Sequence, residues 1–119
     1  MNIYYAKIRI DYVNKTGEKI IVSLKTFGQD EDNASKNVEM MVKKWPNIKN
    51  FTILKISSLP IYLTEYVVRG IVKFKRYPNK DLYFRLKAEN KNEAKELFNL
   101  KTADWKEVVS REIIEVSVY

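Results

Sequence analysis

An internal repeat constrains this chain more than any other feature of its sequence. Residues 112–117 repeat the order of apolar, charged and serine residues found at 52–57, an offset of 112 − 52 = 60. The same offset superposes further pairs: Trp45 on Trp105, Ala34 on Ala94, Val38 on Phe98 and Met40 on Leu100. This agreement indicates a tandem duplication, so the fold is expected to contain the same small unit twice.

Composition excludes several kinds of protein. The chain has 119 residues, 45% of them hydrophobic, which suits one ordinary domain or two very small units sharing a core. It has no cysteine and no histidine, which rules out disulfide bonds and cysteine-ligated zinc and removes the most common general base. No nucleophile–base pair stands out, and the 3 glycines are isolated rather than gathered in a phosphate loop. We expect a protein that is not an enzyme and uses no metal or cofactor.

The N-terminal segment and the apolar runs bear on location. Residues 1–7 lack the basic and then apolar pattern of a signal peptide. No run approaches the ~20 apolar residues that cross a bilayer. We therefore expect no membrane association and a cytoplasmic location, which is the host cytoplasm if a phage encodes the chain.

Periodicity predicts the elements of the first unit. Alternation of apolar and polar residues is typical of half-buried strands, whereas apolar residues at i, i+4 and i+7 are typical of a helix. The acids at 30–32 suit a helix N-terminus far better than a metal site, since hard-cation loops need spaced oxygens and a turn glycine. The expected elements are strands at 3–13, 19–25 and about 51–59, a turn at 14–18, and a helix from Asp30 that buries Trp45.

The second unit repeats this order. Val68, Gly70 and Val72 are expected to face the core, with a turn at 77–81 and a return strand at 82–87. Asn90 begins a helix, and Glu93 follows at the spacing of a capping box. This second helix is expected to be shorter than the first and to lead to a buried Trp105. Residues 112–118 form the last strand.

These elements predict an α+β fold made of tandem ββαβ units, with antiparallel sheets and one helix per unit on one sheet face. The helix returns the chain across the sheet, so the third strand lies beside the first in the order 2-1-3. The units are residues 1–60 and 61–119. The connector at 60–64 is short and apolar, so we expect the units to pack as one compact globule. Either the sheet faces stack, or the third strands pair into one six-stranded sheet, which we favour.

A further indication is a resemblance. The opening residues 5–9, then Gly17 and Glu18, then a strand and an alanine-containing helix, are followed by a second such unit. This pattern resembles small uncharacterised phage and prophage proteins, known only as domains of unknown function with tandem strand-strand-helix-strand units. The resemblance implies a phage or mobile-element origin and carries no catalytic motif. The chain departs from the pattern at the Pro78 turn, which is shorter than the first and lacks glycine.

The second hairpin holds the candidate binding residues. Residues 66–88 contain seven bases and one acid, a charge of 7 − 1 = +6. Where cations lie beside an exposed aromatic ring, the cations can hold the phosphates of a single-stranded nucleic acid and a base can stack on the ring. Alternatively, the lysines only keep an exposed strand soluble. Since like charges that face each other cost stability, a purely structural face would intersperse acids. We expect this face to lack such acids, because the hairpin has one acid against seven bases. The candidate nucleic-acid-binding residues are Arg69, Lys73, Lys75, Tyr83, Arg85 and Lys87.

Two functions compete at this point. The net charge of +7 favours a small nucleic-acid-binding accessory protein that uses the basic face. Open sheet edges instead favour a protein–protein interaction module, such as an inhibitor of a host protein or a virion or assembly component, or a homo-oligomer. Residues 89–119 hold seven acids against five bases, and this polarity suits an oriented contact with a protein.

Overall fold

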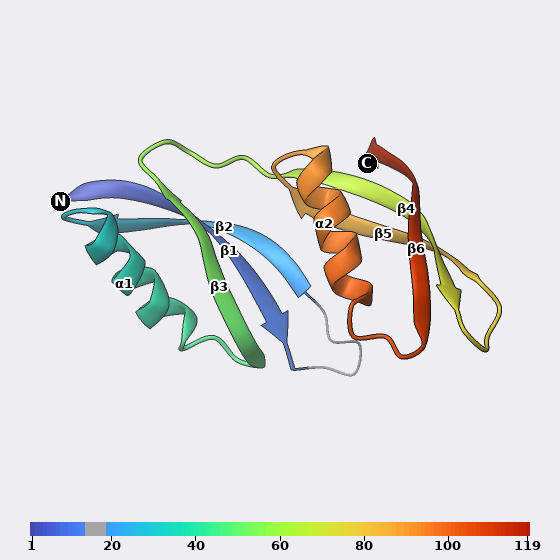
Figure 1. The fold of residues 1–119 in the computed structure, drawn as a ribbon. Coiled ribbons are helices and arrows are strands. Elements are labelled where there is room, and N and C mark those ends of the chain that lie inside the picture. The colour runs from blue at the N-terminus through green and yellow to red at the C-terminus, as the bar shows by residue number, and fades with distance from the viewer. Residues whose placement is uncertain (14–18) are drawn as a thin grey trace. The chain divides into compact units, whose positions relative to one another are not determined.

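The chain folds into two units of the same design. The structure is a computed structural model that describes residues 1–13 and 19–119. It divides into Met1–Leu63, called unit 1, and Thr64–Tyr119, called unit 2. Each unit runs strand, strand, helix, strand, so the α+β class and the tandem ββαβ repeat are confirmed (Figure 1). The turn expected at 14–18 lies outside the described residues, and the packing of the units into one globule stays a prediction.

The elements correspond one to one between the units. Unit 1 consists of β1 (Asn2–Tyr12), β2 (Lys19–Gly28), α1 (Glu31–Val42) and β3 (Ile48–Ser57). Unit 2 consists of β4 (Thr64–Phe74), β5 (Lys80–Ala88), α2 (Lys91–Thr102) and β6 (Val108–Val118). Both helices have 12 residues, so the expectation of a shorter second helix is wrong. The two tryptophans follow the helix ends in turns and are half-buried, and Trp45 packs against the core cluster of unit 1.

Each sheet is antiparallel with its first strand in the centre. The orders are β2-β1-β3 and β5-β4-β6, as the 2-1-3 argument predicts. The expectation of one six-stranded sheet is wrong, because among the described residues each hydrogen-bond ladder ends after three strands of its own unit. Part of the outward face of unit 1 is covered locally instead. Ser23 Oγ donates to the carbonyl of Ile61 in the connector at 3.1 Å, and Ile21 beside it is buried.

The two helices begin in the same way with different residues. Asp30 accepts a hydrogen bond from the backbone N–H of Asn33 at 2.8 Å, and Asn90 accepts one from Glu93 at 2.8 Å. Asn33 and Glu93 in turn accept from the backbone N–H just before each cap, at 3.0 and 2.9 Å. These bonds satisfy N–H groups that have no partner inside a helix. The acids at 30–32 are therefore a helix start, as expected.

The cores of the two units differ at two packed positions, where unit 2 has a smaller side chain in the strand and a larger one in the helix. Ile8 pairs with Val22 and Gly70 pairs with Leu82, so Gly70 occupies the place of Ile8. The small residue in β4 is matched by a large one in α2, since Phe98 stands where unit 1 has Val38. A Cβ at Gly70 would come 2.9 Å from Phe98 Cε1. The glycine therefore gives room to the aromatic ring.

Candidate nucleic-acid interface

The β4–β5 hairpin carries the candidate residues on the sheet face that points away from α2. Tyr66, Val68 and Val72 are buried beneath the helix, and the odd-numbered residues of β4 alternate with them. On β5, Leu86 is buried while its neighbours Arg85 and Lys87 are exposed. Alternation along both strands therefore puts Arg69, Lys73, Tyr83, Arg85 and Lys87 on this outward face, and Lys75 follows the end of β4.

Both arginines of this face form ion pairs with acidic residues on the same face. Arg69 donates two hydrogen bonds to the carboxylate of Asp81, at 3.2 and 2.8 Å. Arg85 Nε donates to Glu65 Oε1 at 3.0 Å. Glu115 lies opposite Arg69 in the register of β6. The expectation that this face lacks interspersed acids is therefore wrong, because acids from β4, β5 and β6 alternate with the cations.

The Arg69–Asp81 pair has a defined electrostatic effect. The hydrogen bond from Arg69, more than any other cause, holds the pKa of Asp81 below its usual value, and the same pair raises the pKa of Arg69. A depressed carboxyl pKa means that the contact stabilises the fold above the unfolded pKa and is lost as the pH falls through the folded one. Both groups are exposed to solvent, so this stabilisation is small.

Three lysines of the hairpin remain without a charged partner among the described residues. No ion pair or ring contact joins the side chains of Lys73, Lys75 and Lys87 to the rest of the chain that the structure describes, and all three are exposed. Lys87 lies opposite Glu65, eight residues along β4 from Lys73. At ~3.3 Å per residue the strand spans about 26 Å between these positions. The lysines therefore form a stripe along the hairpin and not a cluster.

Tyr83 lies between the ends of this stripe. Its side chain is 64% exposed, and it faces Arg69 in the ladder. The Arg69 guanidinium lies over the ring, 5.6 Å from its centroid. Since Arg69 is also fixed by Asp81, the ring rests against an anchored cation. An exposed ring held in this way can stack on a planar ligand with little loss of side-chain freedom.

Unit 1 uses the equivalent position differently. Tyr83 and Ser23 differ by the repeat offset, 83 − 23 = 60. In unit 1 this position carries a hydroxyl that binds the connector at Ile61, which is itself only 8% exposed. The outward face of unit 1 is thus partly covered by its own chain, whereas the aromatic ring of unit 2 is open to solvent.

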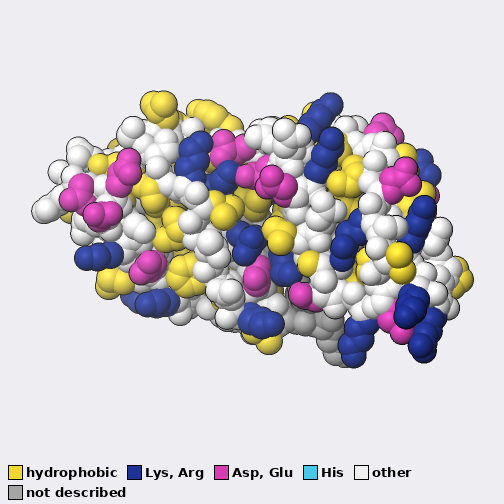
Figure 2. All heavy atoms as spheres, viewed as in Figure 1, with side chains coloured by type: hydrophobic (Ala, Val, Ile, Leu, Met, Phe, Trp, Pro, Cys, Tyr) yellow, Lys and Arg dark blue, Asp and Glu magenta, His cyan; other side chains and the backbone are white. Residues whose placement is uncertain are grey.

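An aromatic cluster at the end of this hairpin was missed from sequence. Phe74 stacks on Trp105 with centroids 6.3 Å apart, and Tyr77 meets Phe74 edge-on at 6.3 Å. Lys80 Nζ lies 6.0 Å from the centroids of both Phe74 and Trp105. Figure 2 shows Lys and Arg side chains gathered at the lower right, where Figure 1 shows the turn of this hairpin. An aromatic residue inside a basic turn, Tyr77 before Pro78, was the signal that could have found it.

A hollow of about 470 Å³ adjoins these rings. We call it the tip pocket. Its walls come from the end of β4, the turn, the start of β5 and the segment after α2: Phe74, Tyr77, Pro78, Asn79, Lys80 and Lys106.

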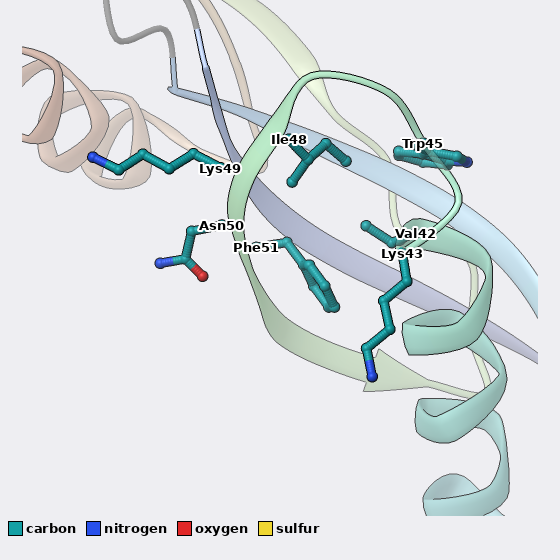
Figure 3. A pocket seen from close by; sticks show the side chains of 7 residues that line it. All are labelled: Val42, Lys43, Trp45, Ile48, Lys49, Asn50 and Phe51. Atoms are coloured by element: carbon teal, nitrogen blue, oxygen red, sulfur yellow. The ribbon is translucent and has the colours of Figure 1, made fainter.

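Unit 1 has a hollow at a different place, between the end of α1 and the start of β3. The hollow has a volume of about 260 Å³. Figure 3 shows the side chains of Val42, Ile48 and Phe51 on one side of β3. The side chains of Lys49 and Asn50 extend to the other side. In unit 2 the positions of Val42 and Phe51 hold Thr102 and Arg111. Arg111 donates to Thr102 Oγ1 at 2.6 Å and to its carbonyl at 2.7 Å. An apolar contact in one unit is thus a polar one in the other.

No family model matches the chain, and no curated protein matches it either.

Within the described ranges, no group of three or more acidic side chains is arranged to hold a metal ion. No helix there is long and apolar enough to cross a membrane.

Proposed function

We propose that this protein is a small non-enzymatic binding protein that holds single-stranded nucleic acid along the β4–β5 hairpin of unit 2. The observation that carries the proposal is the exposed Tyr83 ring on a stripe of three unpaired lysines. Lysines that contact phosphates supply affinity without reading sequence, and a base stacks on the ring. Arg69 and Arg85 act as positioning residues, because carboxylates already occupy their guanidinium groups.

The phosphate contacts are tested by salt dependence. If Lys73, Lys75 and Lys87 each neutralise one phosphate, log K plotted against log salt should have a slope of about −2, since each contact on a single strand contributes roughly −0.7. Binding of a labelled oligothymidine, followed by fluorescence anisotropy, should then weaken roughly 20-fold between about 50 and 200 mM salt. No binding at the lower salt concentration would end the proposal.

The stacking contact is tested separately. Tyr83→Ala should weaken oligothymidine binding by about 1–3 kcal/mol and leave the salt slope unchanged, because stacking releases no counterions. Tyr62→Ala is the matched control, since Tyr62 is a 79% exposed tyrosine of unit 1. Equal effects of the two substitutions would show that Tyr83 makes no specific contact.

A second candidate function is supported by the edge strand β6. It runs 11 residues without proline, and within unit 2 it pairs only with β4. Its exposed apolar residues include Ile114 and Val118. Such an edge can accept a strand from another chain, which fits an inhibitor of a host protein, an assembly component or a homo-oligomer.

The phage or mobile-element origin, and with it action in the host cytoplasm, is part of this proposal. It rests on the order of elements in the repeat. Pull-down of partners from the natural host, with and without nuclease treatment, separates the two functions. Partners that disappear with nuclease favour the hairpin, and partners that persist favour the edge.

A further inference from the structure

We propose that the tip pocket of unit 2 binds one nucleotide, with the base against its aromatic wall and the phosphate on its lysines. This inference rests on the proposed function and extends it, because the residues that line the pocket include neither Tyr83 nor any lysine of the stripe. It assigns a separate subsite to the hairpin end, with a nucleoside monophosphate as the smallest ligand that it takes.

The shape of the pocket suits a planar ring. Its volume of about 470 Å³ lies within the range of small-molecule sites. Phe74 and Tyr77 line it, and the Phe74 ring is held by stacking on Trp105 at an interplanar angle of 12°. Tyr77 is 63% exposed, so its ring can close on a ligand at little cost. Every nucleobase offers a π-face, so aromatic walls accept bases with little regard to sequence.

The charge of the pocket suits an anion. Lys80 and Lys106 both line it, whereas Lys75 and Arg76 follow Phe74 in sequence and are not part of the lining. Arg76 has a weak ion pair with Glu107 at 3.8 Å, and Lys80 lies over the aromatic rings rather than beside an acid. The side chain of Asn79 offers a donor and an acceptor for a base edge. The aromatic wall, the amide and the cations can contact the base face, the base edge and the phosphate of a nucleotide, respectively.

The duplication supplies an internal control. Trp45 and Trp105 are related by the repeat. Phe74 stacks on Trp105 and Lys80 lies over it, whereas among the described residues no ring stacks on Trp45 and no cation lies over it. The two indole N–H signals in a ¹H–¹⁵N spectrum can be assigned with Trp45→Phe and Trp105→Phe. Titration of the full chain with uridine monophosphate should shift the Trp105 indole signal and the backbone N–H signals of Tyr77, Asn79 and Lys80. The Trp45 signal should stay in place.

Variants and control ligands make the test specific. Tyr77→Ala should weaken binding roughly 5- to 150-fold, the equivalent of the about 1–3 kcal/mol that a stacked base contributes. Lys106→Ala should weaken uridine monophosphate but not uridine, which lacks the phosphate. Tyr62→Ala and Lys36→Ala, at exposed positions of unit 1, should change nothing.

The outcomes separate this inference from the function on which it rests. Equal shifts with inorganic phosphate alone, or unchanged binding in Tyr77→Ala, would overturn the pocket as a nucleotide site. Oligothymidine binding without any uridine monophosphate shift at Trp105 would also overturn it and leave the lysine stripe standing. Uridine monophosphate binding without oligothymidine binding would keep the pocket and refute the single-strand function.

Discussion

Gly70 is predicted not to tolerate the addition of a single methyl group. A Cβ at this position would lie 2.9 Å from Cε1 and 3.0 Å from Cε2 of Phe98, and closer still to Cζ. The Phe98 side chain is 0% exposed, so its ring has no solvent to move into. Gly70→Ala therefore forces the buried ring or the helix to shift.

The magnitude follows from two opposing effects. Replacing glycine by alanine where the backbone allows it stabilises a protein by about 0.4–1 kcal/mol, through the unfolded state. Overpacking a core costs about 1–3 kcal/mol. The net loss should be about 1–2 kcal/mol, which lowers a urea midpoint by about 1–2 M at an m-value near 1 kcal/mol/M. Trp105 fluorescence in a Trp45→Phe background reports this unfolding within unit 2.

A second substitution distinguishes overpacking from other causes. Phe98→Leu removes part of the ring, so Gly70→Ala should cost less in its presence, with a coupling of about 0.5–3 kcal/mol. Gly28→Ala is the comparison, because its Cβ would lie 2.6 Å from the backbone nitrogen of Ala34, which no side-chain change removes. A neutral or stabilising Gly70→Ala, or an absence of coupling to Phe98→Leu, would refute the reasoning.

Three further outcomes are expected. Asp81→Asn should strengthen oligothymidine binding and steepen the salt slope by roughly 0.7, because it frees Arg69 for a phosphate. Unchanged anisotropy titrations would show that Arg69 contacts no nucleic acid. Arg111→Ala should cost about 1.5–3 kcal/mol in urea unfolding, since it removes charged hydrogen bonds to Thr102, and an unchanged midpoint would contradict their role. Ile114→Lys should abolish any concentration-dependent increase in mass by light scattering if β6 recruits another chain, whereas persistence of that increase would exclude this edge.

The fold was predictable because its signals are local or repeated. Period-two alternation gave the strands, and the side chains of Asp30 and Asn90 marked the helix starts that the structure has. Because the units are related by an offset of 60 residues, each local sequence pattern could be seen twice, once in each unit. The extent of the sheets was not predictable, because strand sequences alone do not say where a ladder of hydrogen bonds stops.

The interface was predictable only as a set of residues on one face. Alternation puts Lys73, Lys87 and Tyr83 on that face. The pairing of Arg85 with Glu65 joins residues 20 positions apart and depends on register. The tip pocket depends on tertiary structure still more. Its lining comes from the end of β4, the turn, the start of β5 and the segment after α2. Trp105, which stacks on the lining residue Phe74, looks in sequence like a core residue.

The location of binding is the central claim, and two variants of equal charge test it most directly. The hairpin variant combines Lys73→Ala, Lys75→Ala and Lys87→Ala. The α1 variant combines Lys36→Ala, Lys43→Ala and Lys44→Ala, at exposed positions in and after α1. Each variant lowers the net charge of the protein from +7 to 7 − 3 = +4. Anisotropy titration with oligothymidine at about 50 mM salt should show at least a tenfold loss of affinity in the hairpin variant, with a salt slope near zero. The α1 variant should bind almost as tightly as the unmodified protein. Equal affinities of the two variants would contradict the account, since binding would then follow net charge and not the β4–β5 hairpin.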